Sequence, residues 1–320
     1  MSVEKAFDDF QETVNADMGL LKVARGRAAA VKAAFEAEPD VACAWLSGSL
    51  RRSTQLDPVH DVDMVIEYDR PDWGTPGPSA AAAIEHVRGR VKDLLGNPGG
   101  SVEELVRRAD GKNHNRAVKC FVDDPSDPDA FTIDVMPVLR QPDGTLLIPD
   151  ARSTQWVKAD PEHLIRLVED KQRDWEYFRP MVRVLKDWRD RVSVDPPIKS
   201  LCMEVLAIEC LPPGLTRPRA LATFFTRAAV RVNQPIADLA GHCGPIQPDL
   251  DVASLRTALE EAADLLAAAV VAEGRGDDDE ALRLWQKVLG ASFPAPEKSK
   301  TKFGVPALIT AQPVYDRPQG

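Results

Sequence analysis

The chain changes character near Pro149, and this change limits the folds open to it. Before Pro149, short apolar runs alternate with breaks that contain glycine and proline, a pattern typical of strands joined by loops. After it, apolar residues recur at helical spacing from Pro161 to Leu289, with proline pairs between the segments. The sequence therefore predicts a mixed α/β half followed by a mostly helical half.

Each half divides into elements with recognisable ends. We expect strands at 41–46, 62–68, 117–122 and 131–138, and helices over 4–37 and 80–95. The last two strands flank an aspartate-rich turn and are expected to form a hairpin. In the second half we expect helices at 161–174, 176–192, 199–211, 218–232, 251–273 and 278–289. The expected parts are an α/β domain over 1–150 that includes the N-terminal helix, a helical domain over 151–295 and an extended or flexible tail over 296–320.

Composition and charge exclude several classes of protein. Forty basic and 50 acidic residues give a net charge of −10, which disfavours a large non-specific surface for nucleic acid. The five cysteines have no C-x-x-C spacing, which argues against a disulfide framework or a zinc ribbon. No basic N-terminal region precedes an apolar run, and no apolar stretch is long enough to cross a bilayer. We therefore expect a cytoplasmic protein without membrane contact.

Gly48 and Ser49 follow the first predicted strand and open a turn of the kind that holds phosphate. Backbone N–H groups at such a turn suit phosphate oxygens, and glycine lets the ligand approach closely. Arg51 and Arg52 follow shortly after. From the sequence, each could equally well contact phosphate or face solvent. Taken alone, a Gly-Ser turn is weak evidence, because many strands end in this way.

Asp61 and Asp63 lie two residues apart in the second predicted strand, so both side chains point to one face. Like charges side by side on a strand repel each other and need a compensating partner, such as a pair of divalent cations. Taken alone, the pair fits a solvated strand start better, because short motifs often occur by chance.

Asp134 changes this balance because it lies inside an apolar strand. Burying a carboxylate is costly unless it is paired or binds metal. If the strand of Asp134 lies beside the strand of Asp61 and Asp63, three carboxylates converge next to the phosphate-binding turn. This arrangement is typical of two-metal phosphoryl transfer.

Taken together, these motifs resemble those of a known superfamily, the nucleotidyltransferases of the DNA polymerase β type: Gly48-Ser49, Thr54, Asp61-x-Asp63 and Asp134. A second set is similar to bacterial cGAS/DncV-like nucleotidyltransferases (CD-NTases), relatives of cyclic GMP–AMP synthase and oligoadenylate synthetase: Leu185-Lys186-Asp187-Trp188, Lys199-Ser200, Glu204, Trp285, Leu289-Gly290 and Phe293-Pro294. The resemblance spans residues 40–295. It implies an α+β fold, with a polymerase β-like palm of mixed sheet and helices followed by a helical domain like that of oligoadenylate synthetase.

The resemblance implies a role for each matching residue. Asp61 and Asp63 would bind two Mg²⁺ ions, which Mn²⁺ can replace, and Asp134 would be the third ligand and help to activate an attacking 3′-hydroxyl. The nucleotide would be held by residues from both halves: Gly48, Ser49, Arg51, Thr54, Lys186 and Ser200. By sequence alone, Lys186 is also typical of a surface lysine, and Ser200 of a helix cap.

The implied activity is synthesis of cyclic or linear oligonucleotide second messengers from NTPs, with release of pyrophosphate. The resemblance further implies bacterial anti-phage signalling (CBASS) beside an effector that senses the product. Two alternatives stay open: nucleotide transfer to RNA ends or to a protein, as some toxins do, and a catalytically silent nucleotide-binding module. The resemblance also raises the hypothesis that a ubiquitin-like ligase conjugates the Gly320 carboxylate. The sequence itself favours the alternative, an ordinary frayed terminus.

Overall fold

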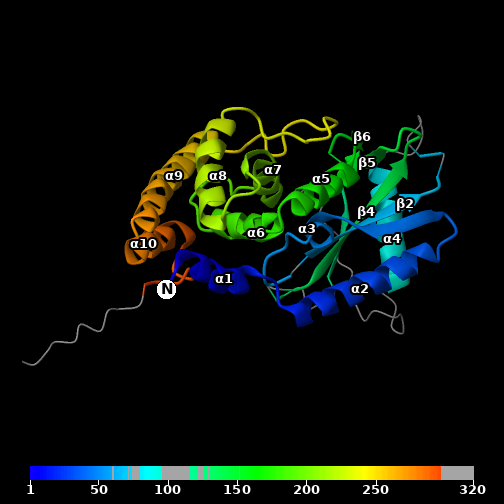
Figure 1. The fold of residues 1–320 in the computed structure, drawn as a ribbon. Coiled ribbons are helices and arrows are strands. Elements are labelled where there is room, and N and C mark those ends of the chain that lie inside the picture. The colour runs from blue at the N-terminus through cyan, green and yellow to red at the C-terminus, as the bar shows by residue number, and fades with distance from the viewer. Residues whose placement is uncertain are drawn as a thin grey trace, which may run out of the picture.

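The computed structural model describes residues 1–59, 61–70, 72–73, 80–95, 116–121, 126–127, 130–150 and 152–296. A mixed sheet with helices packed on it forms one side of the molecule, and a group of helices forms the other (Figure 1). The predicted α+β fold, with a helical second half, is confirmed.

The described sheet has six strands: β1 (Val41–Leu46), β2 (Asp61–Tyr68), β3 (Val118–Phe121), β4 (Thr132–Arg140), β5 (Leu146–Asp150) and β6 (Gln155–Ala159). Their order is β1-β2-β4-β5-β6, and β3 pairs with the first half of β4. β2 and β4 run parallel, and the other pairs of the described sheet are antiparallel. Both the predicted β3–β4 hairpin and the predicted neighbourhood of the strands that carry Asp61 and Asp134 are confirmed.

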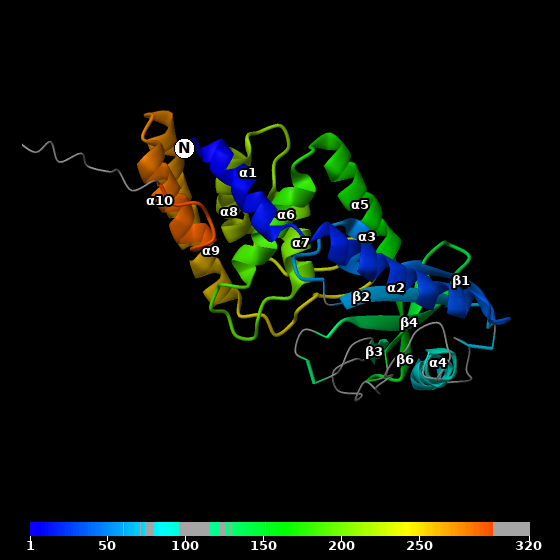
Figure 2. The same cartoon turned by 90° about the horizontal axis from the view of Figure 1, so that it is seen from below.

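Alternation along β2 gives the sheet two different faces. Val62, Met64 and Ile66 are buried against the helices α2 (Met18–Glu36) and α4 (Ala80–Leu95). Figure 2 shows α2 running along the sheet. Asp61 and Asp63 belong to the other face, because successive side chains of a strand alternate. One face is therefore a core, and the other is free to form a site.

The helical half contains α5 (Pro161–Asp174), α6 (Phe178–Arg189), α7 (Ser200–Cys210), α8 (Arg217–Arg231), α9 (Val252–Gly274) and α10 (Asp278–Leu289). Each helix overlaps the segment predicted for it. Their apolar faces share one core, in which Trp285, Phe224 and Phe225 are fully buried.

The N-terminal region forms two helices, where the sequence predicts a single helix over 4–37. The first, α1 (Val3–Val14), ends at Asn15. Asp17 caps α2 by accepting a hydrogen bond from the backbone N–H of Leu20 at 2.9 Å. Short polar side chains such as Asn and Asp bind nearby backbone and therefore favour helix ends over helix interiors.

α1 packs on the helical half and not on the sheet. The ring of Phe7 lies 4.9 Å from that of Trp285 and 5.3 Å from that of Phe293, centroid to centroid. Phe10 also lies 5.3 Å from Phe293. Aromatic rings bury large areas and dominate the cores they join. The first helix of the expected domain over 1–150 therefore packs in the helical core.

The expected boundary at residue 150 falls inside the sheet. β6 follows this position and pairs with β5 from Leu146↔Ala159 to Asp150↔Gln155. The sheet half therefore extends to Ala159, because β6 completes the backbone hydrogen bonds along β5.

The expected tail over 296–320, with Gly320 at its end, lies outside the described residues except for its first residue. In the part of the chain that the structure describes, no helix combines the length and the apolar character needed to cross a membrane.

Candidate active site

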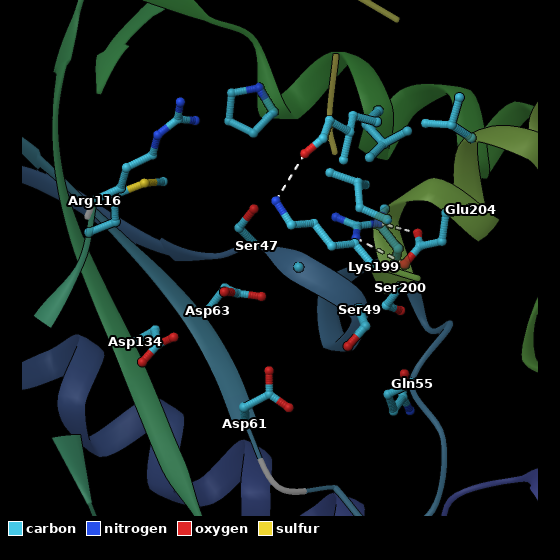
Figure 3. A pocket seen from close by; sticks show the side chains of 18 of the residues that line it. Ser47, Ser49, Gln55, Asp61, Asp63, Arg116, Asp134, Lys199, Ser200 and Glu204 are labelled. Atoms are coloured by element: carbon cyan, nitrogen blue, oxygen red, sulfur yellow. Dashed lines mark hydrogen bonds and ion pairs between the residues drawn. The ribbon is translucent and has the colours of Figure 1, made fainter. Parts of the chain in front are cut away.

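The parallel strands β2 and β4 bring three carboxylates onto one face of the sheet. Asp63 lies directly opposite Asp134 in the register, and Asp61 precedes Asp63 by two residues. Figure 3 shows the three side chains pointing into the same space. The convergence that the sequence predicts is therefore present in the structure.

The charges of the three carboxylates lie close together, and the pKa values of Asp63 and Asp134 reflect this. Burial, together with the negative charges of Asp61 and Asp134, raises the pKa of Asp63 to about 6. Burial also raises the pKa of Asp134, against the opposing charge of Lys119 on β3, whose ammonium lies 4.0 Å from that carboxylate. Clustered carboxylates with raised pKa values are typical of sites that bind cations or move protons.

The turn after β1 closes directly over Asp63. The short helix α3 (Gly48–Arg52) forms this turn, and the backbone N–H of Ser47 donates to the carbonyl oxygen of Asp63 at 2.8 Å. Gly48 has a φ of +63°, and a Cβ placed on it would lie 1.7 Å from Oδ2 of Asp63. Only glycine allows the backbone to adopt this conformation so close to the carboxylate.

A cavity of about 1050 Å³ opens between this sheet face and the helical half. The carboxylates and the Gly48 turn line it at one end. Apolar side chains from both halves, Val65, Met136 and Leu164 among them, line it elsewhere. Apolar walls with a few polar groups are typical of small-molecule sites, and this volume lies near the upper end of their range of about 300–1,000 Å³.

The donor set of the site suits Mg²⁺. Carboxylate oxygens are the ligands that this hard cation prefers, and it usually takes one or two of them and completes its shell with water and substrate phosphates. In the described ranges, no group of three or more His, Cys, Asp or Glu side chains is arranged to hold a metal ion by itself. Asp61, Asp63 and Asp134 therefore fit a magnesium site that the substrate completes.

Four residues predicted to hold the nucleotide line the cavity: Gly48, Ser49, Lys186 and Ser200. Lys199, which precedes Ser200 at the start of α7, also lines it and was not among the predicted binding residues. Its ammonium donates a hydrogen bond to the carbonyl oxygen of Ile246 at 3.0 Å, which is drawn as a dashed line in Figure 3.

Arg51 and Thr54 do not line the cavity, and their expected nucleotide contacts stay predictions. The Arg51 guanidinium forms a surface ion pair with Glu169 at 3.0 Å, and of the two adjacent arginines it is Arg52 that lines the cavity. Successive helical residues point roughly 100° apart, so adjacent arginines cannot share one face. Thr54 is fully buried, and its carbonyl and hydroxyl oxygens accept hydrogen bonds from Lys186.

Lys186 belongs to a buried charged cluster in the cavity wall. The residue is 2% exposed, and its Nζ donates to Oε1 of Glu204 at 2.5 Å. Arg52 donates to the same carboxylate through Nε at 2.6 Å and Nη2 at 3.1 Å. Burial opposes ionisation of Glu204, but the charges of Lys186 and Arg52 lower its pKa to about 2. Burial in turn lowers the pKa of Lys186, against the attraction of the Glu204 carboxylate. The cluster joins the two halves.

The loop between α8 and α9 supplies part of the wall that the sequence did not indicate. Leu239 and Cys243 line the cavity there. The Asp238 carboxylate shapes the loop by accepting hydrogen bonds from the backbone N–H groups of His242 at 3.0 Å and Cys243 at 3.2 Å. Glycine and proline mark the segment as a loop, but no local signal shows that it folds back over a distant strand.

Comparison with known proteins identifies the family of the chain that carries this site. The family model of the Second Messenger Oligonucleotide or Dinucleotide Synthetase domain (SMODS) matches residues 1–171, more than half of the chain. The chain belongs to the SMODS family. The matched segment contains every strand of the described sheet, and with them the three carboxylates and the Gly48 turn.

Relatives of known activity and structure agree with the SMODS assignment. The chain is 23% identical over 316 residues to a cyclic AMP-AMP-GMP synthase of Enterobacter hormaechei, covering 80% of this chain and 81% of that protein. It is 24% identical over 276 residues to a cyclic AMP-AMP-AMP synthase of an Acinetobacter strain, covering 80% and 74%. The structure of CdnC from E. coli MS115-1 with ATP matches at a TM-score of 0.70 and 16% identity, covering 92% of this chain and 99% of CdnC, which shows a shared fold.

The SMODS protein is therefore a nucleotidyltransferase, an enzyme of the class that makes second-messenger oligonucleotides or dinucleotides. The CD-NTase resemblance found in the sequence is confirmed.

Proposed function

We propose that this SMODS protein uses divalent metal to join NTPs into cyclic or linear oligonucleotides, with release of pyrophosphate. The observation that carries the proposal is the register pair of Asp63 and Asp134, with Asp61 beside them, directly under the Gly48 turn. We further propose that the reaction takes place in the cytoplasm and serves bacterial anti-phage signalling, in which an effector senses the product.

The three carboxylates divide the work of the reaction. Two divalent cations held by Asp61, Asp63 and Asp134 would stabilise charge on the attacking and the leaving oxygen. Because β2 lies between β1 and β4, Asp134 is on the far side of Asp63 from the turn that follows β1 (Figure 3). This position suits orientation of the acceptor 3′-hydroxyl by Asp134, while the donor phosphates lie on the side of the turn.

The donor phosphates are held from both halves. The hydroxyl of Ser49 and the backbone of the Gly48 turn face them from the sheet half. Ser200 and Lys199 face them from the start of α7, and Lys186 contributes positive charge from the wall. Lysine acts as a compact point charge, which suits a polyphosphate with several alternative oxygen acceptors.

The relatives that make cyclic AMP-AMP-GMP and cyclic AMP-AMP-AMP point to cyclic trinucleotides as the first products to seek. Conjugation through Gly320 stays a prediction. A mass shift at the C-terminus, measured in cells that carry the neighbouring genes, tests it.

The proposal is tested by incubating the full-length protein with all four NTPs and Mg²⁺ and identifying products by mass spectrometry. We expect pyrophosphate and an oligonucleotide, both lost with EDTA and in Asp61→Ala/Asp63→Ala. The matched control, Asp278→Ala/Asp279→Ala, removes two carboxylates at the start of α10, outside the cavity lining, and should keep activity.

Two results would overturn the proposal. Transfer of labelled nucleotide to RNA or to a protein, without free oligonucleotide, would show that the acceptor is a macromolecule. Binding of NTPs without metal-dependent turnover, even after addition of cell lysate to supply an activator, would show a silent binding module.

A further inference from the structure

A second cavity, of about 650 Å³, opens within the helical half, where the end of α6 meets α9 and α10. Figures 1 and 2 both show α9 and α10 on the side of the helical half that lies away from the sheet. α6 supplies residues to both cavities: Lys186 lines the catalytic one and Trp188 lines the second. Two helical positions this far apart point roughly 200° away from each other, so α6 separates the two cavities.

The lining of the second cavity is positively charged, although the whole chain has a net charge of −10. Its charged members are one carboxylate, Glu261, and three cations: Arg191, Arg256 and Lys287. A cavity lined mainly by one sign of charge raises the local concentration of ions of the opposite sign. The second cavity therefore favours an anion.

The three cations have hydrogen-bond donors left for a ligand. Arg191 pairs with Asp187, and Arg256 lies 3.7 Å from a carboxylate oxygen of Glu260, but neither carboxylate lines the cavity. Lys287 is exposed and has no ion-pair partner among the residues that the structure describes. A guanidinium has five N–H donors, and exposed ion pairs contribute little free energy, so an anion can bind beside these pairs.

Arg191 is held at the wall of the second cavity from two sides. Its Nη1 donates to the carboxylate of Asp187, one turn earlier on α6. On its other side lies Gly290, where a Cβ would come within 2.8 Å of Nε of Arg191. Trp188 and Gly290 stand out among the sequence motifs, yet neither lines the catalytic cavity. Their place beside Arg191 connects these motif residues with the second cavity.

The remaining lining offers apolar surface next to the cations. Val192, Leu265 and Val288 line the cavity together with Trp188. The indole of Trp188 is fixed by an edge-on contact with Phe225, with ring centroids 5.0 Å apart. Apolar walls with a few charged groups, in a volume of about 300–1,000 Å³, are typical of sites for small organic molecules.

We propose that the second cavity binds a small organic anion, with a phosphate or carboxylate group for Arg191 and Lys287 and a flat apolar part for the wall that contains Trp188. A guanidinium matches the geometry of either anionic group. The proposal does not rest on the proposed function, because it concerns a separate cavity and its test measures binding and not turnover.

The test uses phenyl phosphate and benzoate as probes, with inorganic phosphate as the charged group alone and benzyl alcohol as the ring alone. Affinity is measured by calorimetry on the full chain, with Mg²⁺ and a saturating non-hydrolysable NTP present to fill the catalytic cavity. The place of binding is read from backbone hydrogen exchange over residues 187–193 and 253–265.

We expect phenyl phosphate or benzoate to bind at millimolar concentration and to slow exchange in both of these segments. The better probe should bind about tenfold more tightly than inorganic phosphate, because its ring leaves water, and benzyl alcohol should not bind measurably. Whichever of the two probes binds more tightly identifies the anionic group that the cavity prefers.

Arg191→Gln and Lys287→Gln should each weaken binding of the better probe about tenfold, as expected for loss of a charged hydrogen bond. The matched control is Arg283→Gln, also on α10. Arg283 pairs with Glu280 at 3.0 Å and lies outside the lining of the second cavity, so this variant should bind like the wild type.

Three results would overturn the proposal. The first is no binding of either aromatic anion at millimolar concentration. The second is binding that Arg191→Gln and Lys287→Gln leave unchanged, which would place the probe elsewhere. The third is equal affinity for inorganic phosphate and for phenyl phosphate, which would show an adventitious ion only.

Discussion

Replacing Gly48 by alanine tests the contact between the turn and the carboxylates most directly. The new Cβ would lie 1.7 Å from Oδ2 and 2.6 Å from Cγ of Asp63. An ordinary contact begins at 3.4 Å, so the two groups must separate by about 1.7 Å. Gly48→Ala also places a side chain at a φ of +63°, which costs about 1–2 kcal/mol for a residue other than glycine.

The separation predicts the size of the effect on the reaction. A misplacement of about 1 Å in an active site can cost 10²-fold in rate. Because Asp63 is the central carboxylate of the site, we expect turnover of Gly48→Ala to fall by about 10²-fold or more. The two strain terms together are expected to lower the free energy of unfolding by at least about 1–2 kcal/mol.

Gly144→Ala is the matched control. Gly144 has a φ of +86° in the turn between β4 and β5, and a Cβ there would meet no atom within 4 Å. It therefore shares the backbone cost of Gly48→Ala without the contact. Thermal unfolding and pyrophosphate release are measured for both variants. If Gly48→Ala turns over as fast as Gly144→Ala, the carboxylate does not need its position under the turn, and the reasoning fails.

Three further predictions concern charge and packing. The pKa of Asp63 is about 6 in the folded protein, against an ordinary value of 3.8. Between these two pH values the folded state binds more protons than the unfolded state. The free energy of unfolding therefore falls as pH rises through this window, by at most about 3 kcal/mol. Asp63→Asn should therefore stabilise the metal-free protein against urea at pH 7 while abolishing turnover, and equal stability would contradict the electrostatic account. Protons should also compete with metal for Asp63 below about pH 6. The affinity for Mn²⁺, measured by calorimetry, should therefore be weaker at pH 5 than at pH 7. An affinity independent of pH would argue against Asp63 as a ligand. Phe7→Ala should cost about 3–5 kcal/mol in urea unfolding, because the ring is buried against Trp285 and Phe293; a surface-like loss below about 1 kcal/mol would place α1 outside the helical core.

The secondary structure could be predicted where apolar residues repeat at one constant spacing along a whole helix or strand. The helices after Pro161 are amphipathic over several turns, and each of them lies where its apolar spacing indicates. Periodicity could not show the break at Asn15, since apolar residues keep helical spacing on both sides of it. Likewise, the side chains of β6 show no clear alternation between buried and exposed. This segment is a strand because it pairs with β5, so a tertiary contact decides its structure where the local preference is weak.

The carboxylates could be predicted because each carries a local physical conflict. Asp61 and Asp63 repel each other on one strand face, and Asp134 is an acid inside an apolar strand, so a shared cation is the simplest resolution. The choice between Arg51 and Arg52 has no such signal. It depends on the rotational phase of α3, which is set by where Gly48 contacts Asp63. Motif spacing thus identifies charged residues whose burial without a partner would cost free energy. It does not show which way a side chain points when that direction depends on the rotation of a short helix.

Lys186 shows why a matching motif does not by itself fix a role. Its position on α6, ahead of Ser200 on α7, agrees with a phosphate-binding lysine, and the sequence holds no information against that role. The decisive quantity is the number of acceptors that the fold offers its ammonium, and these come from Glu204 in the next helix and Thr54 in the other half. The motif therefore predicts where Lys186 lies in the chain, while the acceptors around its ammonium follow from how α7 and the segment after α3 pack against α6.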